Sequence, residues 1–123
     1  MEEINIENTV DLIHKNQAVF FSSQITLSSA FRVEKLKKLL KTIVQKEKEI
    51  HQALFKDLRK SSFESMTSET IFVEKEIRKM IQLLPSWSRP QRVQSSLLNF
   101  PSRDYIIPEP YGKTLLISPW NYP

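Results

Sequence analysis

The sequence predicts the N-terminal part of an α/β protein, made mostly of helix: three helices, then short strands, then one strand of a parallel sheet. Three observations predict this fold class. Apolar residues recur at helical spacing through most of the first 84 residues, six of the seven prolines lie from Pro90 onward, and a continuous apolar run comes near the end. The 123 residues are enough for one domain with one modest core.

The first helix is predicted over residues 6–23. Its apolar positions keep to one face of a helix and are Ile6, Val10, Ile13, Phe20 and Phe21. The segment SSQITLSS that follows is rich in Ser and Thr, which predicts a connector. Ser28 or Ser29 is then expected to cap the second helix.

The second helix is predicted as one long element that ends near residue 60. Its stripe consists of Leu36, Leu40, Ile43, Ile50, Leu54 and Leu58. Glu47 fills the one gap in the spacing. About thirty residues in one helix give a rod about 45 Å long.

This second helix is strongly basic. From Arg32 to Lys60 there are ten Lys or Arg and four acidic residues, a net charge of +6 against +4 for the whole chain. Such a face binds nucleic acid or an anionic membrane in some proteins. Here the lysines lie opposite the apolar stripe and no aromatic residues alternate with them, so a solvated helix face is favoured and no nucleic-acid partner is predicted.

The third helix is predicted from a cap at Ser62 to Pro85, because proline disfavours helix at the preceding residue and has no N–H to donate. Its stripe is Met66, Val73, Ile77, Met80, Ile81 and Leu84. The two histidines, His14 and His51, lie in helical segments without a ligand partner at i+3 or i+4. Both are predicted to be surface helix residues rather than zinc ligands.

Short extended segments follow the helices. One segment is RVQSSLLNF, which a proline follows directly, and the other is RDYIIPEP, which contains two prolines. Prolines at such places are typical of edge strands. PEPYGK predicts a turn at Gly112, and KTLLIS predicts a strand buried on both faces of a parallel sheet. Because such a strand needs neighbours and the sequence holds no further strand, we expect the chain to be the N-terminal piece of a larger protein.

The composition excludes several kinds of site. The chain has no Cys, so these residues hold no disulfide, no thiolate metal site and no cysteine nucleophile. A single glycine leaves no Gly-rich phosphate loop. No secretory signal and no apolar run of about 20 residues is present, and the expected location is cytoplasmic, with no membrane partner for these residues.

The stretch PEPYGKTLLISPWNYP resembles the aldehyde dehydrogenases, in which a Pro-Gly turn leads into the first strand of the coenzyme domain and then a Pro-Trp-Asn-(Phe/Tyr)-Pro turn. Four further stretches resemble the class-3, fatty- and aromatic-aldehyde group of this family: FFSS, LFKDLRKSSFES, EIRKMIQLLPSW and YIIPEP. The resemblance covers about residues 15–123. The resemblance implies the aldehyde dehydrogenase fold. It assigns residues 1–90 to a helical segment that packs on the coenzyme domain, 91–111 to strands of an oligomerisation arm, and 112–123 to the first strand and catalytic turn of an incomplete coenzyme domain.

The resemblance also implies roles for individual residues. Asn121 matches the family's oxyanion-hole asparagine, whose fixed NH₂ group stabilises the charge that develops on the aldehyde oxygen. The nicotinamide side of the coenzyme cleft is assigned to Ile117, Ser118, Pro119 and Trp120. Tyr122 and Phe72 fall where family members line the aldehyde tunnel. No metal is implied.

The implied parent is an NAD- or NADP-dependent enzyme that oxidises an aldehyde to a carboxylic acid through a cysteine thiohemiacetal, and it acts as a homodimer. Its Cys nucleophile, its Glu base and the Lys and Gly-rich turn that hold the coenzyme lie downstream in the family. We therefore expect these 123 residues alone to be inactive. The alternative is a freestanding basic helical interaction module without catalytic activity.

Overall fold

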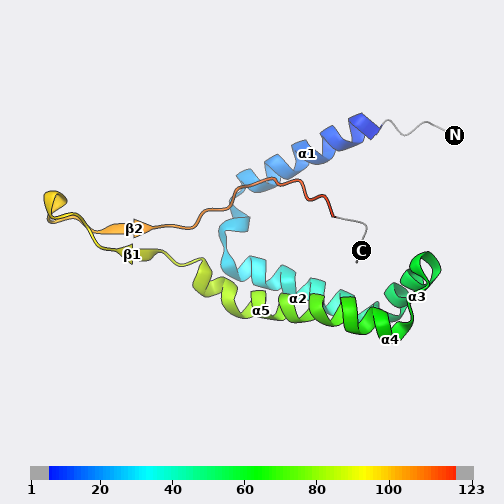
Figure 1. Cartoon of the computed structure of the whole chain (residues 1–123). Helices are drawn as coiled ribbons and strands as arrows, with labels where there is room; N and C mark the ends of the chain where they lie inside the picture. Colours follow the sequence, from blue (N-terminus) through cyan, green and yellow to red (C-terminus); the bar gives the residue numbers. More distant parts are fainter. Residues whose placement is uncertain (1–5, 119–123) are drawn as a thin grey trace.

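The computed structural model describes residues 6–118 and shows a helical hairpin from which a β ribbon and the N-terminal helix project (Figure 1). The elements, in chain order, are α1 (Ile6–Ser22), η1 (Ile25–Leu27), α2 (Ser29–Gln45), α3 (Glu47–Leu58), α4 (Ser62–Ser65), η2 (Met66–Thr70), α5 (Ile71–Trp87), β1 (Gln91–Val93), η3 (Leu97–Asn99) and β2 (Asp104–Ile106). The first helix and the mostly helical character are confirmed.

The hairpin consists of α2 and α5, which pack side by side and run in opposite directions (Figure 1). Ser28 caps α2, as predicted for one of the two serines: its Oγ accepts the N–H of Phe31 at 3.3 Å. Arg32 fixes the open end of the hairpin, because its Nη2 donates to the Ser88 hydroxyl at 3.0 Å and to the Leu27 carbonyl at 3.3 Å.

The long straight second helix is a wrong prediction. The helix is divided at Lys46, whose backbone angles are φ −101° and ψ 8°, and α3 turns away from the line of α2 (Figure 1). The bend gives α3 a second packing partner, since His51 and Leu54 become buried at the end of the hairpin where α4 and η2 lie. Glu47, the one polar residue in the predicted stripe, follows the bend directly.

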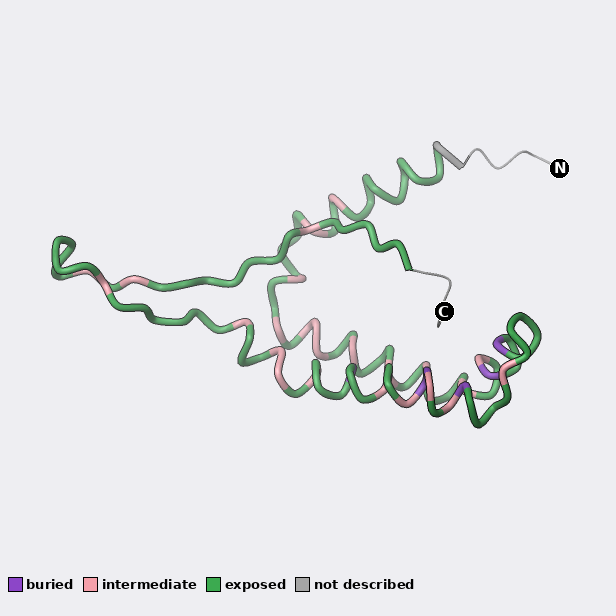
Figure 2. Tube along the Cα trace, in the orientation of Figure 1, coloured by how far each residue is buried: buried purple, intermediate pink, exposed green. Residues whose placement is uncertain are grey.

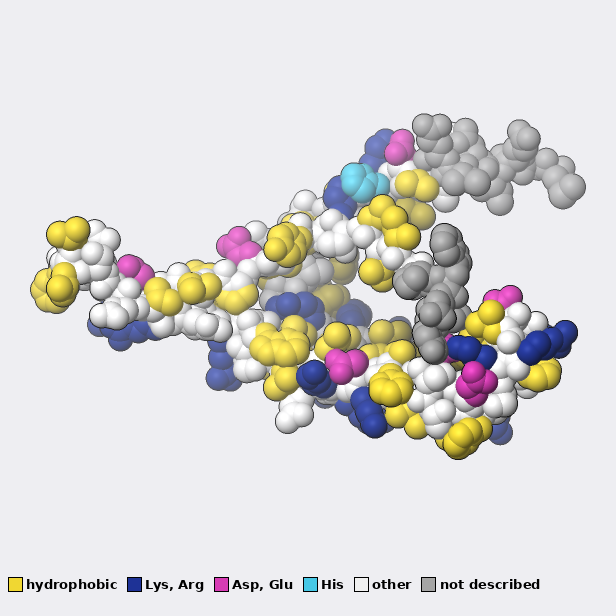
Figure 3. Space-filling model, in the orientation of Figure 1, with side chains coloured by type: hydrophobic (Ala, Val, Ile, Leu, Met, Phe, Trp, Pro, Cys, Tyr) yellow, Lys and Arg dark blue, Asp and Glu magenta, His cyan; other side chains and the backbone are white. Residues whose placement is uncertain are grey.

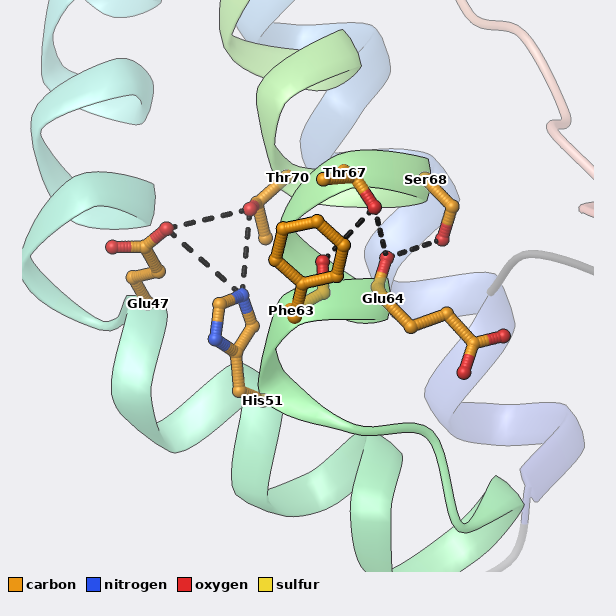
Figure 4. A network of polar contacts seen from close by, with 7 residues as sticks. All are labelled: Glu47, His51, Phe63, Glu64, Thr67, Ser68 and Thr70. Carbon is orange, nitrogen blue, oxygen red and sulfur yellow. Dashed lines mark hydrogen bonds and ion pairs between the residues drawn. The ribbon is translucent and has the colours of Figure 1, made fainter.

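The third helix is also divided, into α4, the π-helical turn η2 and α5. Its cap is Ser61 rather than Ser62, and Ser61 Oγ accepts the N–H of Glu64 at 3.2 Å. Within η2 the hydroxyl of Ser68 donates to the Glu64 carbonyl at 2.7 Å and that of Thr67 to the Phe63 carbonyl at 2.9 Å (Figure 4). These hydroxyls give the widened turn additional partners for its carbonyl groups.

Pro85 does not end the last helix, contrary to the prediction. α5 continues through Pro85 to Trp87. The hydroxyls of Ser86 and Ser88 each donate to a backbone carbonyl three or four residues earlier, at 2.7 Å. Because Pro85 lies only two residues from the end, the helix loses little backbone bonding, and the two serines stabilise its last turn.

The predicted short strands are confirmed as an antiparallel pair. β1 pairs with β2 in a register that sets Arg92 opposite Tyr105, and the ribbon projects from the open end of the hairpin (Figure 1). Ser95 joins the two segments between the strands and the tip, since its Oγ accepts the Asp104 N–H and donates to the Ser102 carbonyl, both at 3.2 Å. The tip carries exposed apolar side chains: Leu97, Leu98 and Phe100.

The buried strand predicted at KTLLIS is not formed. Residues 113–118 belong to no strand, and the side chains of Leu115, Leu116 and Ile117 are 86%, 89% and 80% exposed. A strand of a parallel sheet is buried by its neighbouring strands and by covering helices. Within residues 6–118 the sheet has only the two strands of the ribbon, so the apolar run has no partner there.

The buried residues gather at one end of the hairpin (Figure 2). Within the described range only Leu54 and Ile77 are buried apolar residues, whereas His51, Ser65, Glu69 and Thr70 are buried polar ones. We call this end, formed by α3, α4, η2 and the first residues of α5, the α3–η2 corner. No helix in residues 6–118 is long and apolar enough to cross a bilayer.

Candidate functional site

The segment that leads to the predicted catalytic turn lies against α1. Gly112 has a φ of +92°, a conformation that residues with a side chain rarely adopt, and a Cβ atom there would lie 3.3 Å from Cε1 of Phe21. Two grooves run along this contact, with volumes of about 490 and 400 Å³. Both are lined by Ile13 and Gln17 of α1 and by Lys113 and Thr114 of the segment.

Gly112→Ala is expected to loosen the segment from α1. The positive φ alone costs about 1–2 kcal/mol for alanine, and the new methyl group also presses on the Phe21 ring. Tryptic cleavage after Lys113 should therefore accelerate about 5- to 30-fold, because proteolysis follows the population of the opened segment. Thr114→Ala, which introduces no backbone strain, is the matched control, and equal cleavage rates in the two variants would contradict the role of Gly112.

The structure describes three of the predicted site residues. Ile117 and Ser118 lie on the extended segment, and both are exposed. Phe72 lies near the start of α5, 60% exposed, and lines neither groove beside the segment. Four predicted site residues lie outside the described range: Pro119, Trp120, Asn121 and Tyr122.

The α3–η2 corner contains a polar network that the sequence analysis missed (Figure 4). His51 Nε2 lies 3.4 Å from the Thr70 hydroxyl and 3.9 Å from Glu47 Oε1. The Thr70 hydroxyl donates to the same carboxylate oxygen at 3.4 Å. The prediction of a surface position is therefore wrong for His51, which is buried, whereas His14 is exposed as predicted.

This network joins an acid, a histidine and a hydroxyl, but its geometry is not that of a nucleophilic triad. In a triad the acid and the hydroxyl bond opposite nitrogens of the imidazole. Here Glu47 and Thr70 both approach Nε2 (Figure 4). Thr70 is 4% exposed, so a substrate cannot reach its hydroxyl. The network is a structural one.

A buried ion pair completes the corner. Lys60 Nζ bonds Glu69 Oε1, and the two side chains are 14% and 8% exposed. This pair joins the loop after α3 to η2. The described residues include no group of His, Asp and Glu side chains that could hold a metal ion.

The lysines of α2 and α3 are exposed, as predicted for a solvated helix face. The surface lysines of this region are Lys35, Lys37, Lys38, Lys41, Lys46 and Lys48. Lys35 Nζ stands 4.8 Å from the centre of the Phe31 ring. On the face shown in Figure 3, basic side chains are spread over the hairpin among apolar and acidic ones, without a single concentrated patch.

The sequence is similar to known aldehyde dehydrogenases along nearly its whole length. It is 37% identical over 116 residues to the 4,4'-diaponeurosporen-aldehyde dehydrogenase of Staphylococcus aureus, covering 94% of this chain and 25% of that protein. It is 39% identical over 103 residues to aldehyde dehydrogenase family 3 member B3 of Mus musculus, covering 84% and 22%. It is 33% identical over 113 residues to the dimeric NADP-preferring aldehyde dehydrogenase of Canis lupus familiaris, covering 92% and 25%.

The chain thus spans about a quarter of the length of these relatives. The match to family 3 members agrees with the class-3 resemblance of the helical segments. The sequence model of the aldehyde dehydrogenase family matches residues 6–123, which include both the helical hairpin and the Pro-Trp-Asn-Tyr-Pro sequence at positions 119–123. The chain belongs to the aldehyde dehydrogenase family.

Proposed function

We propose that the protein containing this chain oxidises an aldehyde to a carboxylic acid with NAD or NADP. The observation that carries the proposal is the family match over residues 6–123, together with the Pro-Trp-Asn-Tyr-Pro sequence at its end. In this proposal a cysteine thiolate outside the chain adds to the aldehyde carbon, and the aldehyde oxygen gains the negative charge. The nicotinamide, when bound, would supply the acceptor for the hydride of that carbon, and water, activated by a Glu outside the chain, would then hydrolyse the thioester to the acid.

The contribution of this chain to the chemistry is electrostatic. Asn121 stands between Trp120 and Tyr122, with prolines at positions 119 and 123, and these prolines restrict the backbone on both sides. An amide NH₂ held in this way donates to the oxygen as its charge develops, which lowers the barrier without a rearrangement of solvent. This role rests on the sequence, because Asn121 lies outside the described residues.

The residues before Asn121 fit one side of a nicotinamide site. Ile117 is 80% exposed, so its apolar side chain is available to cover a flat ring, and Ser118 next to it supplies a hydroxyl. In the proposal Ile117, Ser118, Pro119 and Trp120 hold the nicotinamide side of the coenzyme. Tyr122 and Phe72 contact the aldehyde, and the 60% exposed Phe72 side chain is free to do so.

The β1–β2 ribbon supports the proposal of a homodimer. Its tip side chains Leu97, Leu98 and Phe100 are 91%, 95% and 83% exposed. Exposed apolar residues on a projecting ribbon are costly in water unless another surface covers them. The dog relative is named as dimeric, which agrees with a ribbon that pairs with a second subunit.

The structure gives little support to the alternative of a freestanding interaction module. Such a module needs a core of its own, and among residues 6–118 only Leu54 and Ile77 are buried apolar residues. The exposed run at Leu115, Leu116 and Ile117 is typical of a strand that other strands cover.

The experiment that tests the function is an assay of the full-length protein. Formation of reduced nicotinamide is followed with NAD and with NADP in the presence of an aliphatic and an aromatic aldehyde. We expect turnover that requires both aldehyde and coenzyme, with the matching carboxylic acid as product. A folded, dimeric protein that reduces neither coenzyme with either aldehyde would contradict the proposal.

A further inference from the structure

No proline or glycine accounts for the bend at Lys46, although the Thr42 hydroxyl donates to the Lys38 carbonyl at 3.0 Å one turn before it. Sharp bends in helices come almost always from proline, from Gly or Ser pairs, from a π turn or from a group inserted into the hydrogen-bond ladder. Residues 42–50 read TIVQKEKEI and contain none of these residue types. Backbone bonds reach Lys46 from both sides, since its N–H donates to the Thr42 carbonyl at 3.0 Å and the Ile50 N–H donates to its carbonyl at 2.9 Å, but the helix is interrupted at Lys46 itself.

A straight helix is therefore a close competitor of the bent one. The apolar stripe keeps its helical spacing on both sides of Lys46, from Ile43 to Ile50. Straightening would restore ordinary helical dihedral angles at Lys46 and join the two hydrogen-bond ladders into one. The energy that selects the bent form must come from contacts between α3 and the rest of the chain.

Beside the burial of Leu54, polar contacts hold the bent form, and they begin directly after the bend. Glu47, the first residue of α3, accepts the hydroxyl hydrogen of Thr70 at 3.4 Å and lies 3.9 Å from His51 (Figure 4). Thr70 belongs to η2, so the contact ties the start of α3 to the π-helical turn. In a straight helix Glu47 would instead share a face with Ile43 and Ile50, among apolar side chains, which disfavours the charge.

We propose that α2 and α3 form a two-state hinge at Lys46, in which the Glu47–Thr70–His51 contacts hold the bent state and a single straight helix over residues 29–58 is the alternative state. The residues whose contacts hold the bent state lie in α3 and η2. The hinge determines the direction of α3, and with it the direction of the exposed side chains Phe55 and Leu58.

The distance between two spin labels measures the bend directly, and residues 1–123 contribute no cysteine of their own to the labelling. Spin labels are placed on the full-length protein, with its native cysteines replaced by serine, through Lys37→Cys and Lys56→Cys, both exposed positions on either side of the bend. A straight helix separates these two Cα atoms by about 28 Å, and the bent form brings them closer. The distance distribution from pulsed electron–electron double resonance then gives the populations of the two states.

Glu47→Leu removes the polar contacts and completes the apolar stripe, so we expect a second population at the straight-helix distance. Thr70→Val, which keeps the side-chain shape, is expected to shift the populations in the same direction. Glu34→Leu on the exposed face of α2 is the matched control and should keep the single short distance of the unchanged chain. Circular dichroism confirms that each variant is folded, and a single short distance in both Glu47→Leu and Thr70→Val would overturn the hinge.

Discussion

Asn121→Ala in the full-length enzyme is expected to lower kcat by about 10²- to 10³-fold, the usual loss when one oxyanion-hole donor is removed. The charge that Asn121 stabilises exists only after the nucleophile has added to the aldehyde. The loss should therefore appear in kcat and kcat/KM together, with little change in coenzyme binding. Steady-state kinetics and a coenzyme titration of the same preparation measure the two effects.

The matched control for this substitution is Asn99→Ala, an exposed asparagine at the tip of the ribbon. It has the same change of side chain and no place in the proposed chemistry. A burst of reduced coenzyme should also disappear in Asn121→Ala if chemistry has become the slow step. Unchanged turnover in single-turnover experiments, where product release has no influence, would exclude the oxyanion role.

Glu69→Leu is expected to destabilise the α3–η2 corner by about 3–5 kcal/mol, because it removes the carboxylate that bonds the Lys60 ammonium in a nearly buried position. The double variant Lys60→Met/Glu69→Leu removes both charges and should recover most of that loss. Hydrogen exchange of the α4 and η2 amides measures the effect, since the corner opens as a local unit.

A surface pair on α5 provides the control for the buried one. Lys79 Nζ lies 3.7 Å from Glu76 Oε1, with side chains 58% and 60% exposed. Glu76→Leu makes the same exchange of charge for leucine and should change stability by less than about 1 kcal/mol. If Glu69→Leu proves no more harmful than Glu76→Leu, the Lys60–Glu69 pair contributes little to the corner.

Helical periodicity predicted where most of the helical residues lie, and the serine before α2 predicted its cap. The divisions within the helices were missed, because they depend on contacts between distant residues. No proline or glycine marks the bend at Lys46, and the partner of Glu47 is Thr70, 23 residues away. The one available signal was Glu47 itself, a charged residue at an apolar position of the stripe.

The expectation that proline ends a helix was wrong at the end of α5. That expectation assumes that a missing N–H and a crowded carbonyl end a helix. At Pro85 the serines at positions 86 and 88 supply hydroxyl hydrogen bonds to nearby carbonyls, and the helix continues for two further residues.

The KTLLIS run was predicted as a buried strand from its composition. Its burial depends on neighbouring strands, which residues 6–118 do not supply.

The pairing of α2 with α5 has a consequence for synthesis on the ribosome. The apolar stripe of α2 is covered by a helix that ends at Trp87, whereas α2 itself ends at Gln45. At translation rates of about 5–20 residues per second, α2 waits about 2–8 s for its partner. Throughout that interval the lysines on the opposite face of α2 carry a positive charge that disfavours association between copies of the uncovered helix, so the basic run counters aggregation before α5 is made.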